Sequence, residues 1–102
     1  MYEVTEKARE KVIEGYFDSL EPLHMCIFPA KEKKKYITLL YIIECFEKER
    51  YYTEKEVNQI LIQIYFDFVT LRRYLVDYQL LSREKDGSKY WVTNKTNSVE
   101  MD

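Results

Sequence analysis

Basic side chains recur in the second half of the chain at positions that suit contact with nucleic acid. Helical periodicity over residues 67–78 places Arg73 almost opposite the apolar stripe, with Thr70 beside it and Arg72 at the flank. Arginine can bind guanine through two hydrogen bonds, and threonine can contact a phosphate or a base. The pattern predicts a helix face that reads duplex DNA. The alternative is that an arginine pairs with a carboxylate of its own or the preceding helix and fixes helix packing.

A second basic group surrounds an Asp-Gly turn, which is the strongest short hairpin signal. Lys85 and Lys89 lie on the predicted hairpin and Arg83 lies at its base, spaced to reach phosphates or the minor groove beside an inserted helix. Glu84 and Asp86 weaken the local positive field. A solvated turn without a partner is therefore the alternative interpretation.

A third basic group begins the central predicted helix. Lys33 and Lys34, with Lys31 and Lys35, stand in its first turns, where positive charge is unfavourable for the helix dipole. This placement suggests an external reason for the charge. The phosphate backbone of DNA is one candidate, the acidic N-terminal helix is another, and simple solvation is the third.

Residue types that serve metal binding and catalysis are sparse. His24 is the only histidine, and although Cys26 is near, zinc sites use three or four protein ligands. Cys45 is expected to be a small buried side chain. The chain has no Gly-rich phosphate loop, no H-E-x-x-H and no nucleophile elbow. We therefore expect no catalytic residues, no metal ion and no cofactor, and predict a protein that is not an enzyme.

The elements that must position these side chains follow from periodicity and capping signals. Thr53 and Glu56 fit a capping box, and Asp67 fits an N-cap. The first predicted element is a helix over residues 4–20, with an end or bend near Gly15 as the alternative, because glycine costs a helix about 1 kcal/mol relative to alanine. The others are, in chain order, an apolar connector over 23–28 with room for a short strand, a helix over 32–47, a short strand over 51–53, a helix from Thr53, the helix over 67–78, and strands over 80–84 and 89–92. This order predicts a helix-dominated α+β fold: a winged helix-turn-helix with a small sheet, a wing hairpin and an extra N-terminal helix.

Composition fits one domain of ordinary stability. The chain has 102 residues, of which 46% are hydrophobic, with two glycines and two prolines. Its longest apolar run, residues 36–43, is far shorter than the roughly 20 residues of a membrane span, and its start lacks the pattern of a secretory signal. We expect a cytoplasmic protein without membrane association. It divides into an N-terminal helix and connector (1–27), a winged-helix domain (28–93) and a flexible tail (94–102).

Several short segments together resemble a known family. They are Phe28-Pro29-Ala30-Lys31, the run from Tyr52 to Asn58, Asp67 with Leu71-Arg72-Arg73, Leu75-Val76-Asp77, and Arg83 with the run from Asp86 to Trp91. The combination resembles a bacterial domain-of-unknown-function family that occurs alone or fused behind ArsR-type winged-helix regulators. The resemblance implies a winged-helix fold and a role in transcription regulation. One departure is Gln79, where such proteins usually have glycine after the recognition helix; a left-handed conformation there would cost about 1 kcal/mol.

These observations predict a DNA-binding transcriptional regulator that reads duplex DNA with helix 67–78 and wing 83–90. Because one small module seldom gives specific affinity, we also expect a homodimer, formed through the amphipathic helix 4–20. The net charge of −2 supports a different class of function, in which the same fold binds a protein partner and no DNA. A continuous positive face would favour DNA, and interruption by Glu54, Glu56 and Asp77 would favour protein.

Overall fold

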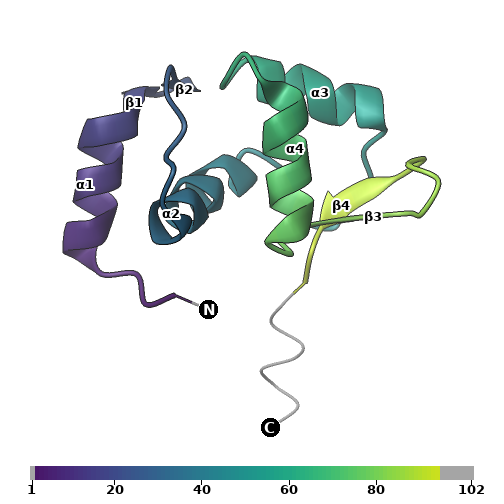
Figure 1. Ribbon diagram of the computed structural model, residues 1–102. Coiled ribbons are helices and arrows are strands. Elements are labelled where there is room, and N and C mark those ends of the chain that lie inside the picture. The colour runs from purple at the N-terminus through teal and green to yellow at the C-terminus, as the bar shows by residue number, and fades with distance from the viewer. Residues whose placement is uncertain (1, 95–102) are drawn as a thin grey trace, which may run out of the picture.

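The computed structural model describes residues 2–94, which form a small α+β fold of four helices and two short antiparallel hairpins (Figure 1). The elements are α1 (Glu6–Tyr16), β1 (Phe17–Leu20), β2 (Leu23–Met25), α2 (Glu32–Ile43), α3 (Glu54–Ile62), α4 (Phe68–Asp77), β3 (Leu81–Arg83) and β4 (Tyr90–Val92). Helix α2 lies between α1 and the α3–α4 pair, and the β3–β4 hairpin lies below α3, beside the lower end of α4 in Figure 1. The predicted tail falls almost wholly outside the described residues.

The N-terminal helix is shorter than predicted and is followed by a strand. Helix α1 begins after Thr5, whose side chain accepts a hydrogen bond from the backbone of Ala8, and ends at Tyr16. Phe17 is already extended, and its buried ring packs edge-on against Tyr41 of α2 at 5.7 Å. The helix thus ends one residue after Gly15, as the alternative has it, and its predicted continuation over residues 17–20 is wrong. Burial of the Phe17 ring and pairing with β2 override the helical periodicity.

Helix α2 is the central element, and three of its side chains, Ile37, Leu39 and Ile42, are at most 1% exposed. The prediction extended this helix to residue 47, but it ends at Ile43. The next two backbone N–H groups, of Cys45 and Phe46, bond three residues back rather than four, which tightens the chain into a turn. Phe46 then returns to the core beside the Tyr52 ring.

Both predicted caps of the following helices are confirmed. The Thr53 hydroxyl accepts from the Glu56 backbone at 3.1 Å, and the Glu56 carboxylate accepts from the Thr53 backbone at 2.9 Å, which completes the capping box of α3. Asp67 caps α4 by accepting from the Thr70 backbone at 3.3 Å. The tight turn between the two helices thus follows directly from local sequence.

Helix α4 ends with Gln79 in the left-handed region, at φ 63°. The Gln79 N–H donates to Val76 and the Leu80 N–H donates to Leu75, which is the pattern of a Schellman motif. Leu75 and Leu80 are both buried, so their apolar contact compensates the backbone strain of a non-glycine residue. The helix therefore ends as it would with glycine, and β3 starts at its expected place.

The β3–β4 hairpin has a regular register, in which Leu81, Ser82 and Arg83 face Val92, Trp91 and Tyr90. Tyr52 forms an isolated bridge to Tyr90, with both N–H···O distances at 2.8 Å. The predicted strand over 51–53 is thus a single bridge beside β4.

One hydrophobic cluster joins all of these elements, from Val12 of α1 to Tyr90 of β4. Among residues 2–94, no helix is long and apolar enough to cross a membrane.

Candidate functional site

Three of the predicted arginines meet at one groove between α4 and the β3–β4 hairpin. The groove has a volume of about 240 Å³. Its lining residues are Val69, Arg72, Arg73, Val76, Asp77, Arg83 and Tyr90. The site therefore combines residues of α4 with residues of the β3–β4 hairpin. Its lining contains three guanidinium groups and one carboxylate, that of Asp77.

The orientation of α4 follows from its buried stripe. Leu71 and Leu75 are fully buried, which turns Arg73 and Asp77 outward to solvent. This is the arrangement that the periodicity predicts for Arg73. An exposed arginine on a helix rim beside a hairpin can reach a ligand without displacing any core side chain.

Arg72 is held inside the protein to a greater degree. Its side chain is 19% exposed; Nη1 donates to the Asn58 side chain, and Nη2 lies 3.9 Å from a Glu54 oxygen. Both partners belong to α3. The packing role that the sequence left open as an alternative is therefore present for Arg72, although its side chain still lines the groove.

Glu54 connects three elements, which the sequence alone did not reveal. Besides its approach to Arg72, its Oε1 accepts a hydrogen bond from the Tyr90 hydroxyl at 2.9 Å. Burial, and then this bond to the Glu54 carboxylate, raise the pKa of Tyr90, so its hydroxyl stays a donor. Glu54 and Tyr90 are 36 positions apart, so nothing in the sequence connects them. In the structure Glu54 positions the Tyr90 hydroxyl beside the groove, besides belonging to the first turn of α3.

Arg83 is tied to the loop of its own hairpin. Its Nε donates to the Glu84 carbonyl at 3.0 Å and its Nη2 to the Lys85 carbonyl at 3.1 Å, while its guanidinium carbon lies 5.6 Å from the Tyr90 ring centre. Gly87 has φ 78°, and a Cβ there would lie 3.3 Å from Arg83 Nη2. The positive φ favours glycine at this position, and a larger residue would also have to displace the Arg83 guanidinium by a few tenths of an ångström.

The other predicted contact residues lie outside this groove. The Thr70 hydroxyl donates to the cap residue Asp67 at 2.7 Å. Lys89 Nζ lies 4.8 Å from the Tyr51 ring centre, and Lys34 Nζ lies 5.8 Å from the Tyr16 ring centre. Lys33 and Lys85 are exposed, on α2 and on the hairpin loop respectively. The lysines are thus spread around the molecule, whereas the arginines converge.

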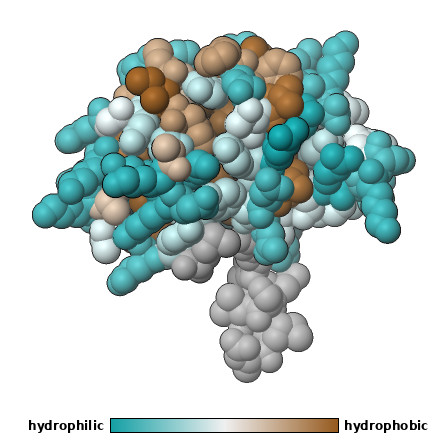
Figure 2. Space-filling model, in the orientation of Figure 1, coloured by the Kyte–Doolittle hydropathy of each residue, from teal (hydrophilic) through white to brown (hydrophobic). Residues whose placement is uncertain are grey.

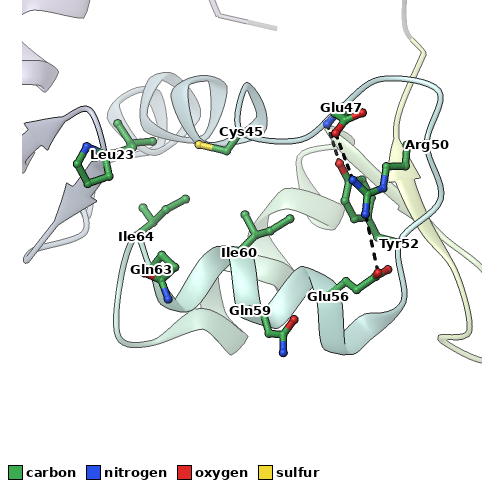
Figure 3. Close-up of a pocket in the computed structure, with 11 residues that line it drawn as sticks. Leu23, Cys45, Glu47, Arg50, Tyr52, Glu56, Gln59, Ile60, Gln63 and Ile64 are labelled. Atoms are coloured by element: carbon green, nitrogen blue, oxygen red, sulfur yellow. Dashed lines mark hydrogen bonds and ion pairs between the residues drawn. The ribbon is translucent and has the colours of Figure 1, made fainter.

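A larger hollow of about 630 Å³ lies between α3, the end of α2 and the β1–β2 turn (Figure 3). Arg50 spans its rim, 3.2 Å from a Glu47 oxygen and 3.8 Å from a Glu56 oxygen, and covers the Tyr52 ring at 4.5 Å. Cys45 also lines the hollow and is exposed, so the prediction of a buried cysteine is wrong. The early end of α2 at Ile43 places Cys45 in the turn beyond the buried helix face.

Partial burial, and then the neighbouring Glu44 carboxylate, raise the pKa of the Cys45 thiol. This disfavours the reactive thiolate. On the rim of the hollow Arg50 is paired with Glu47 and Glu56, whereas the α4 groove brings three of the side chains predicted to bind DNA together. We therefore take the α4 groove as the candidate site.

No curated protein and no solved structure was found to match the chain. A family model described as "Uncharacterized protein conserved in bacteria (DUF2087)" matches residues 24–92. The match starts within β2 and covers every element from α2 to β4, including all three arginines of the groove. Because it spans more than half of the sequence, the chain belongs to this uncharacterised bacterial family.

Proposed function

We propose that the protein is a winged-helix DNA-binding domain of a transcriptional regulator. The order from α2 through the Tyr52 bridge, α3, α4 and the β3–β4 hairpin is compatible with that fold. In this assignment α4 is the recognition helix and the hairpin is the wing. The N-terminal α1 and the β1–β2 hairpin are additions to it.

The convergence of Arg72, Arg73 and Arg83 on the groove between α4 and the hairpin carries this proposal. A recognition helix and a wing bind DNA by presenting cations on both sides of a backbone strand. Arg73 on the helix and Arg83 on the hairpin have this relation. Arg72, whose charge is offset by Glu54, holds α4 on α3.

The exposure of these side chains assigns them different tasks. Arg73 stands on the outer face of α4, where bidentate contact with guanine or a phosphate is sterically open. Arg83 is fixed by two carbonyls of its loop and suits the phosphate backbone. Lys85 on the same loop adds a second backbone contact.

The test is fluorescence anisotropy with a randomised duplex pool over a salt series, followed by sequencing of the bound fraction. We expect the logarithm of the binding constant to fall linearly with the logarithm of the salt concentration, with a slope of about −0.9 for each phosphate contact. Arg73→Ala should weaken binding by about 1–3 kcal/mol and relax the preference at one base position. Lys85→Ala should lower affinity for all sequences and reduce the salt slope by about one contact.

Lys11→Ala on α1 is the matched control, because it removes one exposed positive charge away from the groove. It should leave affinity and salt slope unchanged. Absence of wild-type binding even at low salt, or equal losses in Lys11→Ala and Arg73→Ala, would overturn the proposal.

A protein-binding module without DNA binding is the second candidate, and two observations support it. Asp77 lines the groove and Glu54 lies 3.9 Å from Arg72, so carboxylates interrupt the positive face there. Ile62, Phe66 and Val69 are 43%, 74% and 42% exposed along the α3–α4 turn. Figure 2 shows apolar surface along the upper edge of the molecule, where this turn and the β1–β2 hairpin lie. Such residues could seat a partner protein. This candidate predicts that the wild type shows no DNA binding even at low salt, and that Phe66→Ser loses a captured protein partner that Lys11→Ala retains.

A homodimer remains part of the proposal because one small module seldom supplies specific affinity. The predicted dimer used the amphipathic helix 4–20, but the apolar side chains Ala8, Val12 and Tyr16 of α1 pack into the protein's own core. A dimer through α1 would therefore join charged surfaces, where exposed lysines and glutamates alternate. Sedimentation at tens of micromolar should show a dimer that weakens with salt; a monomer at every concentration would contradict it.

A further inference from the structure

Three side chains with metal-binding atoms meet on the outer face of the β1–β2 hairpin. The two Asp18 carboxylate oxygens lie 2.8 Å from His24 Nδ1 and 3.1 Å from Cys26 Sγ. All three potential ligand atoms lie within 4.8 Å of one another. They stand apart from the α4 groove and from the hollow beside α3.

The strand geometry explains this convergence. His24 lies on β2 and Cys26 directly follows this strand, after the buried Met25, and both side chains reach the Asp18 carboxylate. The register of the hairpin shifts between Phe17 and Ser19, which leaves Asp18 as the extra residue of a β-bulge. A bulge re-aims a side chain, and here it brings Asp18 to the face of His24 and Cys26.

We propose that Asp18, His24 and Cys26 bind a divalent transition-metal ion, with zinc as the best-suited ion. A carboxylate, an imidazole and a thiolate are the three ligand types that zinc accepts in proteins. Magnesium and calcium require sets of oxygen ligands and do not fit a site with one sulfur and one nitrogen donor. The site supplies three protein ligands and leaves a fourth position for water or another molecule.

The distances fit an ion after a small adjustment. Zinc–ligand bonds of about 2.0–2.3 Å in a tetrahedron place neighbouring ligand atoms about 3.3–3.8 Å apart. The 2.8 and 3.1 Å separations end on different Asp18 oxygens, and the three ligand atoms lie within 4.8 Å of one another, so each separation needs to change by no more than about 1.5 Å. Side-chain exposures of 51% for Asp18 and 45% for His24 leave room for this movement.

A bound ion would also fasten the hairpin to the rest of the protein. The N–H of Met25, the residue between His24 and Cys26, donates at 2.9 Å to the carbonyl of Ile64, two residues beyond the end of α3. A metal that fixes β1 against β2 therefore stabilises the contact between this hairpin and the α3–α4 turn.

From the sequence, His24 and Cys26 had no third ligand nearby, and zinc sites use three or four protein ligands. The helix predicted over residues 4–20 gave no reason to expect Asp18 beside them. Pairing of β1 with β2 and the bulge bring Asp18 to the other two side chains as the third ligand. The spacing Asp-x5-His-x-Cys therefore predicts a metal site only once the hairpin is known.

The test is titration of the full, metal-free, reduced chain with cobalt(II), followed by displacement with zinc. We expect one cobalt per chain, with thiolate-to-cobalt charge-transfer absorption in the near ultraviolet. Cys26→Ser should abolish this absorption, and His24→Ala or Asp18→Ala should weaken binding about tenfold or more, the size typical of losing support at a metal site. Zinc should also raise the melting temperature of the wild type and not that of Cys26→Ser.

Cys45→Ser is the matched control, since it removes the other exposed cysteine. It should bind cobalt as the wild type does. Circular dichroism without metal establishes that each variant is folded, which is expected because the three ligands are not in the core. The proposal is overturned if the wild type gives no charge-transfer absorption, or if that absorption survives in Cys26→Ser and disappears in Cys45→Ser.

Discussion

The two hairpins use the same local structure to opposite effect. In β3–β4 the register is regular, and Tyr90 faces inward with no exposed surface while its opposite residue Arg83 lies over its ring at the edge of the groove. In β1–β2 the bulge at Asp18 breaks the alternation and gathers an oxygen, a nitrogen and a sulfur donor on the outer face. A regular hairpin thus extends a cationic surface, whereas an irregular one builds a compact polar cluster.

Anchoring differs as well. The β3–β4 hairpin is joined to the domain by the Tyr52 bridge and by the Glu54 contact to the Tyr90 hydroxyl. The β1–β2 hairpin is joined by the buried Phe17 and Met25 side chains and the bond from Met25 to Ile64. In the β3–β4 hairpin, the Tyr90 side chain both packs in the core and donates the hydrogen bond to Glu54. Its removal should therefore destabilise the protein more than any change in the β1–β2 hairpin.

Truncation of that anchor, Tyr90→Ala, should lower the free energy of unfolding by about 3–5 kcal/mol, the cost of deleting a large buried aromatic side chain. Urea denaturation followed by circular dichroism measures it. Tyr90→Phe, which keeps the ring and removes only the bond to Glu54, should cost about 1 kcal/mol. His24→Ala on the other hairpin, measured without metal, should stay within about 0.5 kcal/mol of the wild type. Equal losses in the Tyr90→Ala and His24→Ala variants would break the contrast between the hairpins.

Neighbouring arginines of α4 should separate stability from binding. Arg72→Ala should lower the free energy of unfolding by about 1–2 kcal/mol, because Asn58 and Glu54 lose their charged partner. Arg73→Ala, on the exposed face, should change it by less than about 0.5 kcal/mol. Measured well below the melting temperature, DNA affinity should fall more in Arg73→Ala than in Arg72→Ala. A large stability loss in Arg73→Ala would mean that this side chain packs within the protein.

Local signals in the sequence predicted the elements that local interactions determine. The capping box at Thr53, the cap at Asp67 and the Asp-Gly turn of the hairpin all mark boundaries that the structure has, and the outward position of Arg73 follows from helical spacing. Membership of the family was also recognised from its motifs. These features depend on residues within one or two turns of each other.

Non-local contacts determined what the sequence could not show. Residues 17–20 form a strand because Phe17 is buried against α2, and Glu54 joins the groove through Tyr90, 36 positions away. The cluster at Asp18 needs both strand pairing and a bulge, neither of which has a periodic signal. Periodicity predicts which face of an element is apolar, but it does not predict which distant polar side chain will meet it.

A smaller effect, this time an increase in stability, is expected from a substitution at Gln79, which lies between α4 and β3. Gln79→Gly should raise the free energy of unfolding by about 0.5–1 kcal/mol, because glycine adopts φ 63° without strain. Gln63 is the matched control: it also follows a helix, but at φ −72°, so Gln63→Gly should bring no gain and a small loss. Thermal denaturation of the two variants compares them directly. A loss of stability in Gln79→Gly would show that the glutamine side chain itself contributes at this position.

The smallest expected effect concerns the loop of the β3–β4 hairpin, where Asp86 is fully exposed. The side chain and then the backbone N–H of Ser88 bond its carboxylate and hold the pKa of Asp86 below its usual 3.8. A depressed pKa in the folded state contributes stability above the unfolded-state pKa, and that contribution is lost as the pH falls through the folded-state value. Ser88→Ala should raise the pKa of Asp86 towards 3.8 in a carboxyl NMR titration, and the wild type should lose its advantage over Ser88→Ala only below about pH 4. An unchanged Asp86 titration would show that the backbone N–H alone holds the turn, and the regular hairpin would then owe its loop to Gly87 and Arg83 rather than to this carboxylate.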